Sequence, residues 1–248
     1  MILAGAHALI TGGGTGIGAA IARTLADAGA QVTLVGRREA VLAASGFTYF
    51  AADVTDPAQV VAAFAHARAT HGPITMLVNN AGAASTAPFA KLTAEQWRAT
   101  MAVNLDALFH CCQAALPDLK AAHAGRIVTI ASTAGLKGYA YTAAYVAAKH
   151  GAIGLTRALA VELARTSVTV NAVCPGFTDT DLVATAVETI VAKTRHDAAT
   201  ARAQLASFNP QGRLIDVQEV ADAVLWLCLP GSHSITGQAI AVAGGETM

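Results

Sequence analysis

The segment Thr11-Gly12-Gly13-Gly14-Thr15-Gly16-Ile17-Gly18 decides how this chain of 248 residues folds. It follows the apolar run Ala6–Ile10 and opens the alanine-rich stretch Gly16–Ala28, so a glycine turn joins an expected strand to an expected helix. Glycines allow a tight turn, let a pyrophosphate approach the backbone and let the helix pack closely on the sheet. The helix N-terminus adds N–H groups and a partial positive charge that suit phosphates. The segment therefore predicts a dinucleotide site.

The spacing of this turn is TGxxxGxG, which matches the general GxGxxG dinucleotide fingerprint only loosely. A flexible turn that binds nothing is the alternative, because many tight turns contain two or three glycines. The position of the turn at the first strand–helix junction favours binding. The residues of the turn expected to contact the cofactor are Gly12, Gly14, Thr15, Gly16, Ile17 and Gly18.

Short apolar runs alternate with helical patterns along the whole chain, as expected for strands that are covered on both faces. The expected strands are Ala6–Ile10, Gln31–Val35, Thr48–Ala51, Met76–Asn79, Arg126–Ala131, Val168–Cys174 and Gln238–Val242. The expected helices are Gly16–Ala28, Pro57–His71, Ala94–Ala122, Ala143–Thr166 and Val217–Leu227. This alternation predicts one α/β domain over residues 1–248, with a doubly wound parallel sheet of seven strands and helices on both faces.

One long segment, Thr178 to Gly212, departs from the alternation. It follows a strand end, where ligands bind in such sheets, so we predict a short substrate lid at about residues 178–212. Three cationic residues of this segment, Lys193, Arg195 and Arg202, could meet a phosphate of coenzyme A or of a carrier protein. A solvated charged face is the alternative.

The end of the second expected strand bears on the choice of cofactor. An NAD site would place an acidic residue here to hold both ribose hydroxyls, whereas this chain has Gly36 followed by Arg37 and Arg38. A guanidinium fork suits a ribose 2′-phosphate, so NADP(H) is favoured and NAD(H) stays open. The alternative is that an arginine only stacks on adenine or is solvated.

A tyrosine and a lysine, Tyr145 and Lys149, lie four residues apart on an expected helix and so share one face. An ammonium beside a phenol favours the phenolate, so we expect the pKa of Tyr145, ordinarily about 10, to be lowered toward neutrality. Ser132 lies just past the fifth expected strand, where its hydroxyl can meet a substrate oxygen or cap a turn. These residues predict an acid–base centre beside a redox cofactor.

The chain strongly resembles the short-chain dehydrogenase/reductase family over essentially its whole length. The matching elements, in order, are Thr11–Gly18, Asp53-Val54, Asn79-Asn80-Ala81-Gly82, Asn104, Ser132, the Tyr145-x-x-x-Lys149 pair, Asn171, Pro175-Gly176 and Thr180. A YxxxK pair alone is common by chance, whereas the ordered set is very specific. The resemblance implies a Rossmann fold and NAD(P)-dependent oxidoreductase activity on the CH–OH group of a donor.

The resemblance also implies a role for each catalytic residue. Tyr145 would donate a proton to the carbonyl oxygen or accept it in reverse, and Lys149 would lower the tyrosine pKa and bind the nicotinamide ribose. Ser132 would hydrogen-bond the substrate oxygen, and Asn104 would hold a water that relays protons to Lys149. The other residues expected to border the cofactor are Asp53, Val54, Asn80, Ala81, Gly82, Pro175, Gly176, Phe177, Thr178 and Thr180.

The segments Pro210–Leu214 and Ile235–Gln238, together with the lid, resemble the 3-oxoacyl reductases and 3-hydroxyacyl-CoA dehydrogenases of the family. We therefore expect interconversion of a ketone and a secondary alcohol, with a 3-oxoacyl/3-hydroxyacyl thioester as the favoured substrate. One alternative is an NAD-dependent dehydrogenase of a small or cyclic secondary alcohol. Another is a protein that senses nucleotides without catalysis.

Composition narrows the partners of the chain. Sixteen basic and sixteen acidic residues balance to zero formal charge, and no basic run appears, so nucleic acid is not expected to bind. No metal-binding motif is present, and no apolar run is long enough to span a membrane. The four cysteines show no CxxC spacing, which suggests reduced thiols in a cytoplasmic protein. Few charges predict that apolar faces are covered by oligomerisation, and the family resemblance implies a homotetramer built on the small-residue helix Ala143–Thr166 and the helix before it.

Overall fold

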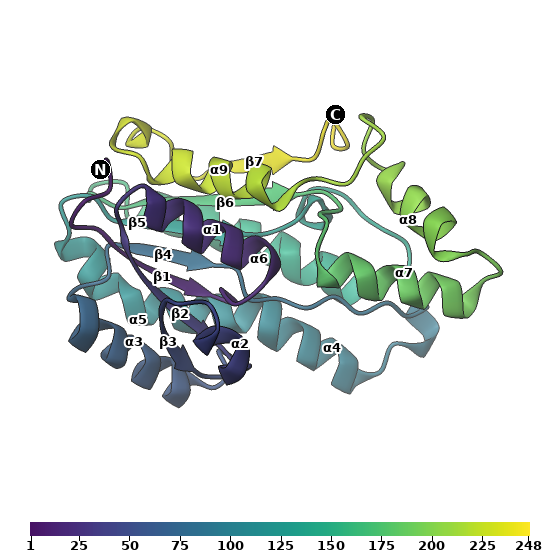
Figure 1. Cartoon of the computed structure of the whole chain (residues 1–248), viewed down its shortest axis with the longest axis horizontal. Helices are drawn as coiled ribbons and strands as arrows, with labels where there is room; N and C mark the ends of the chain where they lie inside the picture. The colour runs from purple at the N-terminus through teal and green to yellow at the C-terminus, as the bar shows by residue number, and fades with distance from the viewer.

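The computed structural model describes residues 1–248, and its centre is one parallel sheet (Figure 1). The strands are β1 (His7–Thr11), β2 (Gln31–Gly36), β3 (Thr48–Ala51), β4 (Met76–Asn79), β5 (Arg126–Ile130), β6 (Thr169–Pro175) and β7 (Ala239–Val242). Their order across the sheet is β3-β2-β1-β4-β5-β6-β7, and every pair is parallel. The predicted single α/β domain with a seven-stranded sheet is confirmed.

Helices cover both faces of the sheet, as predicted (Figure 1). The helices are α1 (Gly16–Asp27), α2 (Glu39–Ala43), α3 (Pro57–His71), α4 (Ala94–Met101), α5 (Ala107–Ala121), α6 (Ala143–Glu162), α7 (Asp181–Lys193), α8 (Ala198–Ala206) and α9 (Val217–Cys228). Helices α1 and α9 pack against each other on one face, where Ile21 and Val224 are buried. Helices α3 and α5 bury Phe64 and Cys111 on the other face.

The strand order reverses between β1 and β4, and this reversal positions the site. The connections that leave β1 and β4 run to opposite faces, so a crevice forms at the carboxyl ends of these two strands. The glycine turn follows β1 and Asn80 follows β4, which places both at this crevice. The fold thus brings together residues that lie 69 positions apart in the chain.

The single helix expected over Ala94–Ala122 is interrupted. Helix α4 ends at Met101, a π-helical turn occupies Ala102–Asp106, and α5 begins at Ala107. Such wide turns often occur at functional sites, because they re-aim a side chain within a helix. Here the turn contains the buried Asn104.

The predicted lid segment contains α7 and α8, which pack against each other and project from the rest of the molecule (Figure 1). Val183 is buried, whereas Val191 on the same helix is 37% exposed. The apolar face of α7 is therefore only partly covered within the chain. None of the helices combines the length and the apolar character needed to cross a membrane.

Candidate active site

The glycine turn after β1 is held in place by the end of β4. The Asn80 side chain donates to the carbonyl oxygens of Thr11 and Gly12, each at 3.0 Å. In return, the Thr11 hydroxyl accepts from the backbone N–H groups of Asn80 and Ala81, each at 3.0 Å. These four hydrogen bonds fix the turn, so its backbone is organised before any ligand arrives.

Two glycines of this turn have steric reasons to be glycine. Gly12 has a φ of +64°, a conformation that L side chains rarely adopt. A Cβ on Gly18 would lie 2.3 Å from the Gly12 carbonyl oxygen and 2.5 Å from Asn80 Nδ2. The close approach of α1 to the turn therefore leaves no space for a side chain.

The N-terminus of α1 offers free backbone N–H groups. Thr15 is the N-cap residue, yet its side chain makes no capping hydrogen bond, and the first turn contains no acidic residue. The first N–H groups of a helix lack partners within the helix and attract anions together with the helix dipole. The cradle of glycines and open N–H groups fits the pyrophosphate of a dinucleotide.

The residues expected at the adenosine end follow β2 and β3, at the same edge of the sheet as the glycine turn. The Arg38 guanidinium donates to the Thr15 hydroxyl at 3.0 Å, and Arg37 is exposed. The Asp53 carboxylate accepts from the backbone N–H and the hydroxyl of Thr55, so its orientation is fixed. Val54 is buried. The Arg38 guanidinium thus contacts the residue that precedes α1 in the glycine turn.

The expected catalytic side chains converge from three elements. Tyr145 and Lys149 lie on α6, and the Lys149 ammonium is 5.6 Å from the centre of the Tyr145 ring. Ser132 follows β5, and its hydroxyl accepts from the Ala134 N–H at 3.1 Å, as a turn cap would. Asn104 enters from the π-helical turn.

Asn104 is held by the backbone on two sides. Its Nδ2 donates to the carbonyl oxygens of Ala83 at 2.8 Å and Thr100 at 2.9 Å. The Ala83 N–H donates back to Asn104 Oδ1 at 3.3 Å. Gly82 lies beside both Asn104 and Lys149, because a Cβ there would be 2.9 Å from Asn104 Oδ1 and 3.6 Å from Lys149 Nζ. Asn104 and Lys149 therefore face the same small space.

The expectation that Lys149 lowers the pKa of Tyr145 is wrong for the contacts within this chain. Burial raises the pKa of Tyr145, and only the nearby Ser132 hydroxyl opposes that rise. Burial also lowers the pKa of Lys149 to about 8. The physical reason is geometric, since Lys149 Nζ donates to the Ile130 carbonyl oxygen at 2.9 Å instead of approaching the phenol oxygen. The phenol is thus kept protonated, as a proton donor requires.

The segment after β6 leads into the lid and contacts the glycine turn. The Thr178 hydroxyl donates to the Gly176 carbonyl oxygen at 3.0 Å, and the Thr180 hydroxyl donates to that of Thr178 at 3.2 Å. A Cβ added to Gly16 would lie 3.1 Å from the Thr180 methyl group, so the two residues are close neighbours. Pro175 ends β6, and Phe177 follows. These residues therefore border the same crevice as the turn.

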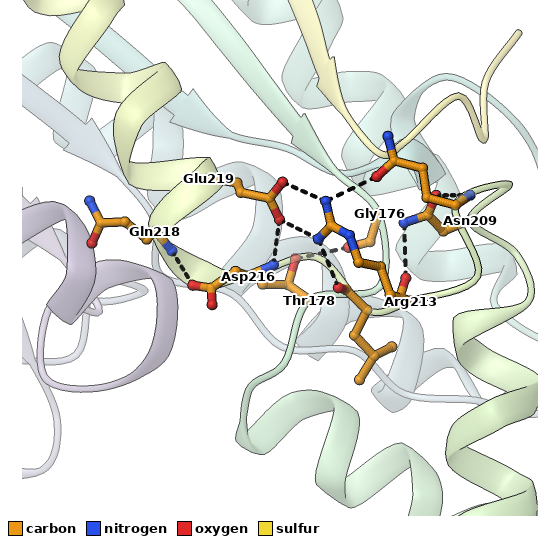
Figure 2. Close-up of polar contacts among 9 residues, drawn as sticks. Gly176, Thr178, Asn209, Arg213, Asp216, Gln218 and Glu219 are labelled. Carbon is orange, nitrogen blue, oxygen red and sulfur yellow. Dashed lines mark hydrogen bonds and ion pairs between the residues drawn. The ribbon is translucent and has the colours of Figure 1, made fainter.

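The far end of the lid is anchored by an ionic network (Figure 2). The Arg213 guanidinium pairs with both Glu219 carboxylate oxygens, at 2.6 and 2.8 Å. The backbone carbonyl oxygen of Arg213 accepts from the Asn209 side chain at 2.9 Å. A parallel bridge joins Thr178, where the lid begins, to Ile215, which follows the end of the lid. Both ends of the lid are therefore fixed next to β6.

The lid cations do not act as one group. Arg202 pairs with Asp179 at 2.5 Å, so its charge is already balanced across the lid. Lys193 and Arg195 are exposed and form no ion pair. Arg202 is consequently a poor candidate for a phosphate ligand.

Sequence reasoning missed Glu246, whose side chain is only 1% exposed and contacts Tyr139 and Lys137. No sequence signal marks it, because a glutamate after two glycines near a C-terminus usually lies in a solvated turn. Tyr139 is half-buried, whereas Tyr141 is 66% exposed with a φ of +65°.

Comparison with known proteins places the chain in a family. The model of the short chain dehydrogenases matches residues 6–190, which includes the glycine turn and the catalytic candidates. The chain belongs to the short-chain dehydrogenase family. It is therefore an oxidoreductase, and it carries the family's fold around the site described above.

Relatives of known name cover nearly the whole chain. A D-beta-hydroxybutyrate dehydrogenase of Rhizobium meliloti is 37% identical over 97% of this chain and 98% of its own length. A 3-oxoacyl-(acyl-carrier-protein) reductase of Salmonella typhimurium is 36% identical over all of both chains. Among solved structures, a variant of actinorhodin polyketide ketoreductase with NADPH superposes with a TM-score of 0.93 at 36% identity, covering 98% of this chain and 97% of that one.

Proposed function

We propose that this short-chain dehydrogenase uses NADP(H) to interconvert a ketone and a secondary alcohol, with a 3-oxoacyl/3-hydroxyacyl thioester as substrate. The observation that carries the proposal is the convergence of Tyr145, Lys149, Ser132 and Asn104 beside the glycine turn. The names of the relatives, which include a 3-oxoacyl reductase and a hydroxybutyrate dehydrogenase, support the substrate class.

Each candidate residue has a chemical task in this proposal. NADP(H), when bound, supplies or accepts the hydride. Ser132 donates a hydrogen bond to the ketone oxygen, where negative charge develops during reduction. Tyr145 gives its phenolic proton to the same oxygen, and its raised pKa keeps that proton available. Lys149, whose ammonium donates to the Ile130 carbonyl oxygen, binds the cofactor ribose in this proposal.

Asn104 and the glycine turn have supporting tasks. The backbone hydrogen bonds of Asn104 fix its amide near Lys149, where it holds a water that returns a proton to the lysine. The remaining cofactor contacts are proposed for Gly12, Gly14, Thr15, Gly16, Ile17, Gly18, Asp53, Val54, Asn80, Ala81, Gly82, Pro175, Gly176, Phe177, Thr178 and Thr180. The lid, residues 178–212, closes over the substrate.

The function is tested by following cofactor absorbance with panels of 3-oxoacyl thioesters, cyclic ketones and secondary alcohols, each with both cofactors. We expect the highest kcat/KM for a 3-oxoacyl thioester with NADPH. A preference for a cyclic alcohol with NAD would support the alternative dehydrogenase. Binding of NADPH without turnover of any compound would contradict catalysis and favour a nucleotide sensor.

Cofactor choice depends on Arg37 and Arg38 in this proposal. Changing both to alanine should raise the KM for NADPH about 10- to 100-fold, because a charge-assisted hydrogen bond contributes about 1.5–3 kcal/mol. The KM for NADH should stay within about twofold, since NADH has no 2′-phosphate. Arg165→Ala, an exposed arginine elsewhere, is the matched control. Equal changes for both cofactors would contradict this assignment.

We also propose a cytoplasmic homotetramer. The four cysteines are free and buried, which suits a reducing compartment. Phe109 on α5 is 47% exposed and Val161 on α6 is 79% exposed, so these helices present apolar side chains to a partner. Gly154 is open to solvent, whereas Gly151 is glycine because Leu105 of the same chain packs on it.

Light scattering at micromolar concentration should report a mass near four chains of 25.1 kDa. Association in an oligomer would cover these exposed apolar side chains. A mass of one chain would contradict the tetramer. The outcome does not bear on the catalytic assignment, because all four catalytic candidates come from one chain.

A further inference from the structure

The C-terminal turn reaches into the loop that joins Ser132 to Tyr145. The Tyr139 hydroxyl donates a hydrogen bond to Glu246 Oε1. The Lys137 ammonium lies 3.2 Å from the same oxygen and 3.0 Å from the Glu246 backbone carbonyl oxygen. One carboxylate thus holds two side chains of a loop that begins and ends at catalytic residues.

The surrounding backbone is shaped to admit this carboxylate. A Cβ on Gly176 would lie 2.8 Å from Glu246 Oε2, so only glycine leaves the space that the carboxylate fills. Gly244 has a φ of +58°, and a Cβ there would lie 1.9 Å from Asn209 Oδ1. The C-terminal turn is therefore packed against both the end of β6 and the end of the lid.

Glu246 Oε2 is buried and has no hydrogen-bond partner. A buried polar atom without a partner costs about 1–3 kcal/mol, so stability alone is a weak reason for a glutamate here. The other carboxylate oxygen, Oε1, accepts from the Tyr139 hydroxyl and so fixes that side chain. Because the Tyr139 proton goes to Glu246, the Thr133 hydroxyl must donate to Tyr139, at 2.6 Å. Thr133 is the direct neighbour of Ser132.

The fixed Tyr139 ring completes an aromatic wall. Its centroid lies 6.0 Å from that of Phe177 and 5.8 Å from that of Phe208, both in edge-to-face geometry. Phe177 and Phe208 are themselves 5.1 Å apart. The three rings come from the catalytic loop, the segment after β6 and the end of the lid. Phe208 is 43% exposed, so the wall has an open apolar side.

We propose that Glu246 is a positioning residue that sets substrate selectivity. It holds Tyr139 against Phe177 and Phe208, and the wall so formed binds the apolar carbon chain or ring attached to the ketone. This inference rests on the proposed ketone reductase function. It gives Glu246 no contact with the reacting atoms.

The test compares Glu246→Ala and Glu246→Gln with the native protein over 3-oxoacyl thioesters of increasing chain length. We expect Glu246→Ala to raise the KM of the longer thioesters about tenfold, with kcat and the KM of the shortest one within about twofold. For Glu246→Gln, the KM of the longer thioesters should lie between the values for the native protein and for Glu246→Ala. The amide oxygen still accepts from Tyr139, but the ion pair with Lys137 is lost. Glu162→Gln, an exposed glutamate at the end of α6, is the control.

Four further measurements distinguish the proposed role of Glu246 from a purely structural one. Tyr139→Phe should flatten the chain-length profile in the same way, and the double variant with Glu246→Ala should be no worse than either single variant. The Kd for NADPH and the Tm report a general loss of structure. Equal rises of KM for all chain lengths, following a fall in Tm, would overturn the proposal.

Calorimetric titration of the same compounds measures binding without turnover. If the native protein binds long chains more tightly and Glu246→Ala loses that preference, the inference stands even if no compound is reduced, and only the proposed reaction fails. If Glu246→Ala keeps the native chain-length profile in both KM and Kd, the inference fails while the reductase function stands. A native protein with no chain-length preference also overturns it.

Discussion

We expect Tyr145→Phe to lower kcat for ketone reduction about 10²- to 10⁴-fold, the usual contribution of a positioned general acid. The change removes one hydroxyl and leaves the ring, so packing on α6 is retained. The Tyr145 hydroxyl lies beside Ser132, on the same helix face as Lys149. Steady-state kinetics measure the effect, and Kd for NADPH should stay within about twofold.

Tyr141→Phe is the matched control for that experiment, because Tyr141 lies just before α6, close to Tyr145 in sequence, and is 66% exposed. We expect it to retain kcat within about twofold. A Tyr145→Phe protein with native kcat, or a Tyr141→Phe protein as inactive as Tyr145→Phe, would reject the assignment of the acid.

The second large effect is expected for Gly18→Ala. The new methyl group would lie 2.3 Å from the Gly12 carbonyl oxygen and 2.5 Å from Asn80 Nδ2, so the hydrogen bonds that fix the turn cannot survive unchanged. Overpacking of this kind costs about 1–3 kcal/mol of stability. The Kd for NADPH should rise at least about tenfold, because the displaced turn no longer presents its N–H groups to the pyrophosphate.

Calorimetric titration with NADPH and thermal unfolding measure the two parts of this effect. Gly231→Ala is the control, since nothing lies within 4 Å of a Cβ at that position. It should leave both the Kd and the Tm nearly unchanged. A Gly18→Ala protein that binds NADPH with native affinity would mean that the turn is not the phosphate cradle.

The sheet could be predicted from the sequence because its strands are buried on both faces and read as continuous apolar runs. The bounds expected for β3 and β4 are the observed ones, and the other strands shift by one residue at one or both ends. Strand ends are set by pairing with neighbours, and apolar pattern alone does not encode that pairing. Helix α6 ends at Glu162, earlier than the expected Thr166, for a similar reason.

The interruption at Ala102–Asp106 could not be predicted, because the helical pattern continues through it. The turn is stabilised by Asn104, whose amide bonds to Ala83, a residue of a distant loop. The spacing of apolar residues carries no information on contacts between residues that are far apart in the chain. The same limit explains Glu246, which is functional only because Tyr139 and Gly176 come to meet it.

The proximity of Tyr145 and Lys149 could be predicted from their spacing, whereas their electrostatics could not. The spacing of Tyr145 and Lys149 correctly places both on one helix and near each other. Spacing does not reveal that Lys149 is turned toward Ile130, nor that burial raises the pKa of Tyr145. The direction of a pKa shift depends on burial and hydrogen bonding, which only the folded chain defines.

The central claim, that Tyr145 supplies the proton to a ketone reduced by NADPH, is tested most directly by single-turnover reduction across pH. A phenol donates only while protonated, so the native rate constant should be constant at low pH and fall as pH rises through the tyrosine pKa in the complex. Tyr145→Phe, loaded with NADPH, should be slow and should lose that dependence on pH. Reduction by Tyr145→Phe at the native rate, with the native pH profile, would contradict the account.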